Sequence, residues 1–275
     1  MINRFFPGIL LFAFIQSINS SPGIVDTSPF TNDTLIDAGG HKMHFVVIKA
    51  GEPTILLEAG GGDDASQWET VQRKLSTETN ATVISYDRAG FGKSELPGTA
   101  YDIRKEAQDL HYCLGLLGTR KLILVAHSYG AFLTQAYQFM YPLAITAIIL
   151  ADPNTVPFVD SIGFAMLTRI SFDTTKPLSN TQKADVRQTI AFRSTIETLR
   201  EMPFSKNIPL TILSAEKDWW PLPQWNQWWK NSHQSIVSSA PNRALIIAKG
   251  SSHNVPQEQP GVIVDAIINI LKGLR

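Results

Sequence analysis

Ser128 stands where an apolar run passes directly into a predicted helix. Residues 122–126 read Leu-Ile-Leu-Val-Ala, and the apolar segment that begins at Gly130 follows without an intervening loop. A strand–corner–helix of this kind strains the serine backbone and raises its hydroxyl above a sheet, where it can act as a nucleophile. Small residues are needed on both sides because strand and helix cross closely, and Ala126 and Gly130 meet that need. The alternative role for Ser128 is that of a helix cap.

A serine nucleophile needs a base to take its proton, and His253 is the favoured histidine. It follows the apolar run 243–249 through the loop 250–252. We therefore expect it at the carboxyl end of a strand, where active-site groups collect in α/β folds. His127 is expected to point to the opposite face of its strand from Ser128. The other histidines lie in a hairpin or on helices, away from this corner: His41, His44, His111 and His233.

No metal, cofactor or nucleotide site is expected. His41 and His44 stand three residues apart on a predicted strand, which places them on opposite faces, and no third ligand is evident. The segment 87–94, Asp-Arg-Ala-Gly-Phe-Gly-Lys-Ser, imitates a phosphate-binding loop, but Asp87 occupies the place of its first glycine. We therefore expect neither a bound metal nor a bound cofactor.

The elements that must position these residues alternate between strand and helix. Six short runs rich in Ile, Leu and Val, typical of strands covered on both faces, occupy residues 54–58, 82–86, 121–126, 146–151, 209–214 and 243–249. An opening hairpin is predicted from 34–38 and 42–49, with Gly39 and Gly40 in its turn. The pattern predicts an α/β fold with a mostly parallel central sheet of about eight strands and helices on both faces.

One connection in this pattern is much longer than the dozen or so residues that a plain crossover needs. It lies between the runs 146–151 and 209–214 and contains helix-like stretches at 164–170 and 182–202. We interpret residues of about 153–207 as a helical cap, or lid, over the carboxyl edge of the sheet. The alternative is a packing appendage without substrate contact.

The combined motifs resemble the α/β-hydrolase-fold superfamily. Ala-His-Ser-Tyr-Gly at 126–130 is joined by Glu-Ala-Gly-Gly-Gly at 58–62, by Trp68 and by Tyr-Asp-Arg-Ala-Gly-Phe-Gly-Lys-Ser at 86–94, in the order and spacing of that family. The resemblance covers one domain, residues 21–275, and implies a Ser-acid-His triad in that chain order. It also implies that 87–94 is a structural turn. Ala126 departs from the glycine that the family usually has there.

The acid of the triad is predicted to be Asp218. It follows the run 209–214 by a few residues, which is where the family usually places a carboxylate to hold the histidine. Asp152, directly after the run 146–151, is the alternative, because some relatives use that position. Glu216 is a third candidate and is more plausible as a hydrogen-bonding residue of the loop.

The resemblance also indicates an oxyanion hole, in which two N–H groups bind the oxygen that gains negative charge. One donor is expected to be the backbone N–H of Tyr129, directly after the nucleophile. Alignment of residues 59–62 with the family's His-Gly-x-Gly assigns the other to Gly61, with Gly62 as the alternative. Ala59 replaces the usual histidine, so bracing of the loop by that imidazole is missing.

The predicted function is that of a serine hydrolase that cleaves carboxylic esters, or related acyl compounds, through an acyl-enzyme. Trp219 and Trp220, beside the predicted acid, are expected to line the substrate pocket, which suits a small to medium apolar acyl or aryl substrate. One alternative is an aminopeptidase or amide hydrolase, for which Glu197 and Glu201 of the cap could hold a free amine. The other is a ligand-binding protein without catalysis.

The N-terminus indicates export. Arg4 precedes an apolar stretch at 5–15 and small residues at 17–21, so residues 1–20 are predicted to be a cleaved signal peptide and the protein to be secreted or periplasmic. No later stretch is long and apolar enough to span a bilayer, so no stable span is expected after signal removal. With 24 basic and 24 acidic residues, a polybasic nucleic-acid binder is excluded. The expected partner is a small-molecule substrate.

Overall fold

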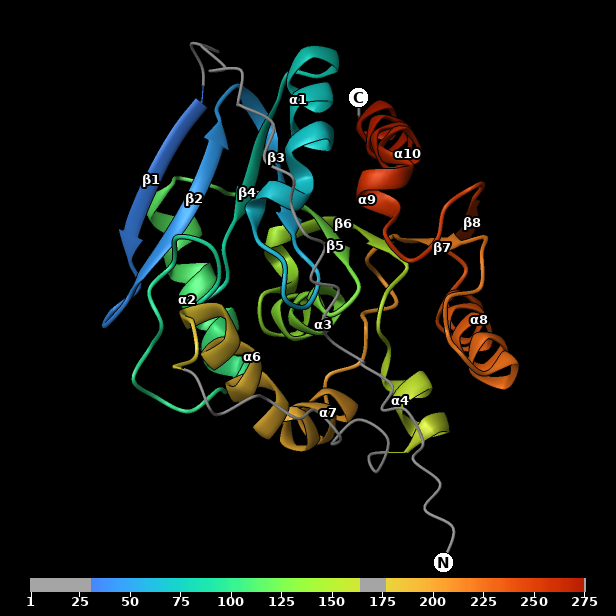
Figure 1. The fold of residues 1–275 in the computed structure, drawn as a ribbon. Coiled ribbons are helices and arrows are strands. Elements are labelled where there is room, and N and C mark those ends of the chain that lie inside the picture. The colour runs from blue at the N-terminus through green and yellow to red at the C-terminus, as the bar shows by residue number, and fades with distance from the viewer. Residues whose placement is uncertain (1–30, 164–176, 275) are drawn as a thin grey trace, which may run out of the picture.

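The computed structural model describes residues 31–163 and 177–274, which form an eight-stranded sheet (Figure 1). The strand order is β1-β2-β4-β3-β5-β6-β7-β8; β2 is antiparallel to β1 and to β4, and all other neighbours are parallel. The strands are β1 (Thr31–Asp37), β2 (Lys42–Ile48), β3 (Gly51–Glu58), β4 (Ala81–Tyr86), β5 (Leu122–His127), β6 (Ile145–Ala151), β7 (Leu210–Ala215) and β8 (Arg243–Ala248). The predicted α/β fold with a mostly parallel sheet is confirmed.

Burial explains why the central strands read as continuous apolar runs. Every residue of β5 is buried, because helices cover the strand on both faces. β8, at the edge of the sheet, is partly exposed along its length. The opening hairpin is also confirmed: Gly39 and Gly40 have φ values of 86° and 129°, which favour glycine, and form the turn between β1 and β2.

The helices lie on two faces of the sheet, as predicted. α1 and α10 pack on one face, around a core that includes Trp68 and Ile267, and α2, α3 and α8 pack on the other, around a core that includes Phe132 and Ile236. The helices are α1 (Glu69–Glu78), α2 (Ile103–Leu116), α3 (Gly130–Met140), α4 (Val156–Ile162), α6 (Asn180–Ile190), α7 (Phe192–Arg200), α8 (Pro223–Ser238), α9 (Val255–Glu258) and α10 (Pro260–Gly273).

Local signals in the sequence set where several helices begin. The Asp102 side chain accepts a hydrogen bond from the backbone N–H of Arg104 and caps α2. Ser179 and Gln182 form a reciprocal capping box at the start of α6. Pro260 opens α10, because its missing N–H has no helical partner to lose there.

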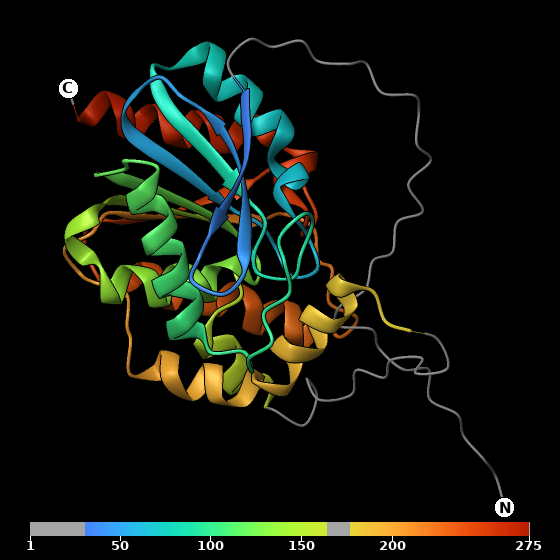
Figure 2. The same cartoon turned by 90° about the vertical axis from the view of Figure 1, so that its left-hand side faces the viewer.

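The long connection between β6 and β7 contributes α4, α6 and α7 to one end of the molecule. Figures 1 and 2 show α6 and α7 below the sheet, on the side toward which the parallel strands point. Gln135 of α3 fixes this region, because its side-chain amide donates to the backbone carbonyls of Leu199 and Met202 at 3.0 Å each. The connection therefore sits beside the carboxyl edge of the sheet; the stretch 164–176 lies outside the described residues.

The predicted signal peptide, residues 1–20, also lies outside the described residues. In the part of the chain that the structure does describe, no helix combines the length and the apolar character needed to cross a bilayer.

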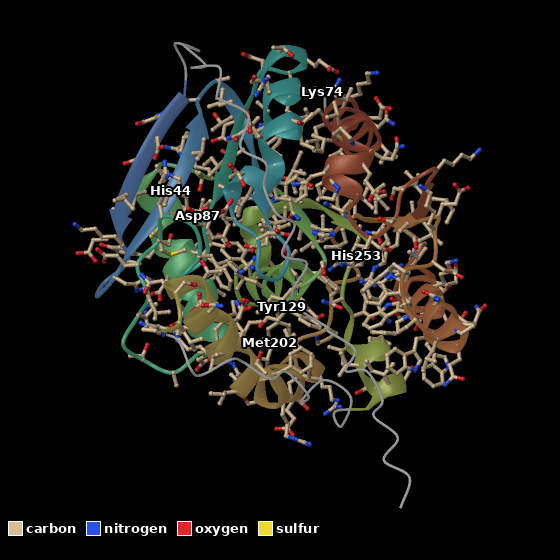
Figure 3. The ribbon with its side chains drawn as sticks, in the orientation of Figure 1. His44, Lys74, Asp87, Tyr129, Met202 and His253 are labelled. Carbon is tan, nitrogen blue, oxygen red and sulfur yellow. The ribbon has the colours of Figure 1, made fainter. Side chains whose placement is uncertain are left out.

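The segment that imitates a phosphate loop is a tight turn organised around Asp87. The carboxylate of Asp87 accepts hydrogen bonds from the backbone N–H groups of Ala65 (2.8 Å) and Lys93 (2.7 Å) and pairs with the imidazole of His44 at 2.7 Å (Figure 3). At Gly92 a Cβ atom would lie 2.2 Å from this carboxylate, so only glycine fits. The motif is therefore a structural turn, and the side chain of Asp87 occupies its interior.

Candidate active site

Ser128 occupies a sharp corner between β5 and α3. Its φ of 49° lies in the left-handed region, which costs a residue with a side chain about 1–3 kcal/mol. Two backbone hydrogen bonds hold the corner. The Ser128 N–H donates to the Ala151 carbonyl (3.2 Å), and the Ser128 carbonyl accepts from the Asn154 N–H (3.0 Å). The predicted strand–corner–helix is therefore confirmed.

Close packing around the corner explains why small residues flank it. A Cβ atom at Gly130 would lie 2.6 Å from both the backbone oxygen of Ala59 and the Cγ of Glu58. Ala126 is completely buried. The start of α3 therefore rests directly on the end of β3 and on the loop that follows it.

His253 lies within hydrogen-bonding distance of the serine. Its Nε2 is 2.9 Å from Oγ of Ser128, so the hydroxyl can donate to the imidazole. The loop after β8 carries it there: Gly250 has a φ of 79°, and its N–H donates to the Glu216 carboxylate at 2.8 Å. Glu216 is thus a hydrogen-bonding residue of the loop, as the sequence analysis favours. The arrangement can transfer a proton from Ser128 to His253.

His127, the last residue of β5, steadies this loop. Its Nε2–H donates to the backbone carbonyl of His253 at 2.8 Å, and its ring centroid is 4.8 Å from that of His253. Burial, with a contribution from the charge of His253, lowers the pKa of His127 to about 3, so this ring stays neutral. The printed partners of the Ser128 hydroxyl are His253 and Asn154, whereas His127 holds the backbone of the residue that meets that hydroxyl.

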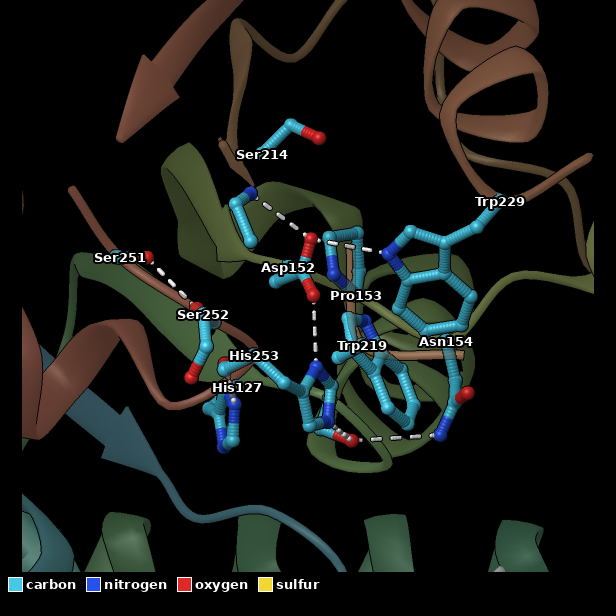
Figure 4. A network of polar contacts seen from close by, with 12 residues as sticks. His127, Asp152, Pro153, Asn154, Ser214, Trp219, Trp229, Ser251, Ser252 and His253 are labelled. Atoms are coloured by element: carbon cyan, nitrogen blue, oxygen red, sulfur yellow. Dashed lines mark hydrogen bonds and ion pairs between the residues drawn. The ribbon is translucent and has the colours of Figure 1, made fainter. Parts of the chain in front are cut away.

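Asp152 is the carboxylate that meets His253. Its Oδ2 accepts from Nδ1–H of His253 at 2.7 Å, while its Oδ1 accepts from the Ala215 N–H and from Nε1–H of Trp229, both at 3.0 Å (Figure 4). The side chain is fully buried. Burial alone would raise the pKa of Asp152, but the hydrogen bond and charge of His253 outweigh it, so the pKa lies below its usual value.

The prediction of Asp218 as the acid is wrong in geometry. Asp218 lies three residues beyond the end of β7, where the chain has left the sheet; its side chain is 57% exposed and pairs with Lys230 of α8. Asp152 directly follows the last residue of β6 and has a φ of 40°, which turns its side chain toward His253. The alternative weighed in the sequence is therefore the one that the structure supports.

Asn154 is a neighbour of the nucleophile that the sequence analysis missed. Its side-chain Nδ2 lies 3.5 Å from Ser128 Oγ (Figure 4), and its backbone N–H donates to the Ser128 carbonyl. Its position two residues after Asp152 and three residues beyond the end of β6, the strand next to β5, was the available signal.

Of the two predicted pocket residues, Trp219 lies against the triad and Trp220 lies behind it. The Trp219 ring stacks on the His253 imidazole, with centroids 4.0 Å apart and planes 23° from parallel. Trp220 is buried in an aromatic cluster with Phe158, Trp225 and Trp229. Trp219 therefore limits the space around His253, whereas the buried Trp220 ring packs behind Trp219.

The residues predicted for the oxyanion hole lie on two segments that pack together. Tyr129 lies between Ser128 and the first residue of α3, as the N-cap, so its N–H lies at a helix N-terminus. Gly61 belongs to the loop after β3, and in this loop the Gly60 N–H already donates to Oε1 of Gln67 at 2.9 Å. A Cβ atom at Gly60 would lie 2.6 Å from Nδ1 of His127, which shows how closely the loop approaches the site.

Arg88, missed as a site residue, braces this loop where the expected histidine is replaced by Ala59. Its guanidinium donates to the backbone oxygens of Ala59 and Gly60 and to the carboxylate of Glu58. Tyr86 donates its hydroxyl to the same carboxylate. Burial raises the pKa of Glu58, and the charge of Arg88 opposes part of that rise.

Within residues 31–163 and 177–274, no three His, Cys, Asp or Glu side chains are grouped as a metal site requires.

Most of the chain is similar in sequence to a known protein family. Residues 55–266 match the model of the alpha/beta hydrolase family. An uncharacterized protein, YqjL of Bacillus subtilis (strain 168), is 29% identical over 221 residues, which cover 79% of this chain and 83% of that protein.

Two solved structures share the fold. A putative epoxide hydrolase from Pseudomonas aeruginosa is 17% identical, with a TM-score of 0.65 over 90% of this chain and 97% of that one. A thermophilic esterase from Thermogutta terrifontis is 20% identical, with a TM-score of 0.60 over 88% of this chain and 98% of that one. Chains of this fold thus include proteins described as acting on different bonds, so the fold alone does not assign a function.

Proposed function

Because the chain belongs to the alpha/beta hydrolase family, we propose that it is a serine hydrolase that cleaves carboxylic esters through an acyl-enzyme intermediate. The observation that carries this proposal is the continuous hydrogen-bonded series from Ser128 Oγ to His253 Nε2 (2.9 Å) and from His253 Nδ1 to Asp152 (2.7 Å). A base between a hydroxyl and a buried carboxylate is the arrangement that activates serine for attack on a carbonyl.

The proposed reaction uses the three side chains in turn. His253 takes the proton of Ser128 while Oγ attacks the ester carbonyl, and Asp152 stabilises the resulting imidazolium. The N–H groups of Tyr129 and Gly61 bind the oxyanion. His253 then gives the proton to the departing alcohol, and a water molecule repeats the sequence on the acyl-enzyme to release the acid.

The chemistry of serine favours carbonyl substrates over epoxides or alkyl halides. Attack of Ser128 on an epoxide or a carbon–halogen bond would form a serine ether, which has no carbonyl for water to attack, so the enzyme would not turn over. Attack on an ester forms a serine ester, which the same triad can hydrolyse. The presence of serine, at position 128, as the proposed nucleophile thus supports acyl transfer.

The two alternatives receive less support. Glu197 and Glu201, the candidates for holding a substrate amine, are exposed on or beside α7. A ligand-binding protein without catalysis would not need a buried acid to orient a histidine beside a serine. We propose a small to medium apolar acyl or aryl substrate, limited on one side by Trp219, and export directed by residues 1–20.

The test combines turnover with chemical labelling. Wild-type protein and Ser128→Ala would be assayed with p-nitrophenyl esters from acetate to octanoate, and a fluorophosphonate probe would be mapped by peptide mass spectrometry. We expect hydrolysis by the wild type, a fall of at least about 1,000-fold in the variant, and labelling at Ser128. Equal rates for the two proteins, or no labelling of Ser128, would contradict the proposal.

A further inference from the structure

Arg88 lies beneath the loop to which we assign half of the oxyanion hole. Its side chain is 1% exposed. Nη1 lies 2.5 Å from the Ala59 oxygen and 2.6 Å from Glu58 Oε1, and Nη2 lies 2.5 Å from the Gly60 oxygen. One guanidinium therefore binds two successive carbonyls of the loop and its own counter-ion, and it follows β4 rather than the loop itself.

The bond to Gly60 acts on the N–H of Gly61 because both belong to one peptide group. A trans peptide is planar, and its C=O and N–H point in opposite directions. The single cis bond in the described residues is Glu52–Pro53, so the Gly60–Gly61 peptide is trans. Once Arg88 holds the carbonyl, the Gly61 N–H is aimed away from Arg88. The Gly60 N–H donates to Gln67, so Gly61 supplies the next N–H of the loop.

A cation on the carbonyl also strengthens the N–H at the other end of the peptide. Hydrogen bonds in series polarise one another, so an amide whose oxygen binds a guanidinium is a better donor than a free amide. Glycine at 61 leaves this backbone donor open to a substrate, because no side chain shields it.

Arg88 also contacts the second segment of the proposed hole. Its Cζ lies 5.8 Å from the centre of the Tyr129 ring and 4.9 Å from that of Phe91. The Ala59 oxygen that Arg88 binds is the atom against which α3 packs at Gly130. The guanidinium therefore binds the carbonyl of the peptide that carries the Gly61 N–H and lies beside the ring of Tyr129, the residue that carries the other proposed donor.

Stability alone is a weak reason for this arrangement. A buried ion pair gains little net free energy, since the cost of removing two charges from water offsets their attraction, and apolar replacement of both partners is often neutral. The bonds of Arg88 to loop carbonyls are therefore better explained by geometry than by stability.

We infer that Arg88 is a positioning residue for ester hydrolysis: it orients and polarises the Gly60–Gly61 peptide so that the Gly61 N–H stabilises the oxyanion. The inference rests on the proposed function. Arg88 acts through the loop backbone, and it does not touch the substrate.

The test removes the guanidinium without leaving a buried charge. Glu58→Gln/Arg88→Met is neutral and retains an acceptor for the Tyr86 hydroxyl, and Glu58→Gln alone is the matched control with Arg88 present. For each protein, kcat and KM for a p-nitrophenyl ester, the inhibition constant of phenylboronic acid and the melting temperature would be measured. The boronic acid forms a tetrahedral adduct on Ser128 that mimics the oxyanion state.

We expect kcat of the double variant to fall about 100-fold, as on loss of one oxyanion donor, with KM changed less than threefold. The affinity for phenylboronic acid should fall in parallel, while Glu58→Gln stays within about fivefold of the wild type. Arg88→Lys can reach one carbonyl, so its kcat and boronic acid affinity should lie between those of the double variant and the wild type. If the double variant does not fold, Arg88→Lys provides the test.

Two results would overturn the inference. One is a folded double variant, or Arg88→Lys if only that folds, with the kcat and boronic acid affinity of the wild type. The other is a loss of kcat without a loss of boronic acid affinity. Failure of the proposed function is separate: the wild type itself would then neither hydrolyse esters nor react with the fluorophosphonate.

Discussion

Asp152, in the turn after β6, and Glu106, in the first turn of α2, are both buried carboxylates, yet their pKa values move in opposite directions. Burial raises the pKa of Glu106 to about 7, and Arg187 of α6, with Nη2 3.9 Å from its carboxylate, opposes only part of this rise. Burial also acts to raise the pKa of Asp152, but the hydrogen bond and charge of His253 outweigh it, so this pKa lies below its usual value.

The difference lies in the donors that reach each group. Asp152 accepts from an imidazole, a backbone N–H and an indole N–H within 3.0 Å. Glu106 faces a cation at a longer distance. Burial therefore does not by itself decide whether an acid is ionised; donors close enough to replace water decide it. An ionised Asp152 can stabilise an imidazolium, whereas Glu106 titrates near neutral pH.

The largest expected effect comes from removing the charge of Asp152. Asp152→Asn should lower kcat/KM for a p-nitrophenyl ester by about 10,000-fold, because an amide favours the wrong tautomer of His253. Asp218→Asn, the matched change at the exposed carboxylate, should stay within twofold of the wild type. Steady-state kinetics on both variants would test this. A larger loss of kcat/KM in Asp218→Asn than in Asp152→Asn would reverse the assignment of the acid.

A smaller effect is expected when Asp152 loses one donor. Trp229→Phe removes the indole N–H from Asp152 and should lower the free energy of unfolding by about 2 kcal/mol, with a severalfold loss of kcat. Trp225→Phe is the control, because Trp225 lies on the same helix, is similarly buried and is not among the donors to Asp152. Urea denaturation and ester kinetics would compare them; equal losses in the two variants would mean that ring packing alone matters.

The smallest effect on catalysis is expected at Glu106, where the measured quantity is the pH dependence of stability. Its folded-state pKa is raised from 4.5 to about 7, so its contribution to stability is full below pH 4.5 and is lost as the pH rises through 7. Glu106→Gln removes this titration. The stability of the variant relative to the wild type should therefore increase by up to about 3 kcal/mol between pH 5 and pH 8. Urea denaturation at both values measures it, and the same difference at both would show that Glu106 titrates as an exposed group does.

The sequence predicts the parts of the site that depend on neighbours along the chain. Ser128 is identifiable because an apolar strand, small flanking residues and a helix follow one another within a few positions. His253 is identifiable because it follows the last strand through a short glycine loop. The short apolar runs and the glycine turn likewise predict the sheet and its hairpin.

The sequence could not decide the acid, because Asp152 and Asp218 both follow apolar strands. What separates them is the direction of one side chain at a φ of 40° and an indole that reaches Asp152 from residue 229. Arg88 was missed for a similar reason, since its partners Glu58, Ala59 and Gly60 are about 30 residues away along the chain and are identified only by the folded sheet.

The left-handed backbone at Ser128 and at Asp152 has a consequence for how this protein tolerates change. Both residues occupy positions at which glycine would relax the chain, so each carries a standing conformational cost for the sake of its side chain. At Asp152 the buried hydrogen bonds to the carboxylate offset this cost. Selection for heat resistance alone, with no demand for turnover, should thus replace Ser128 before Asp152, and a glycine at 128 would be expected to give an inert but more stable protein.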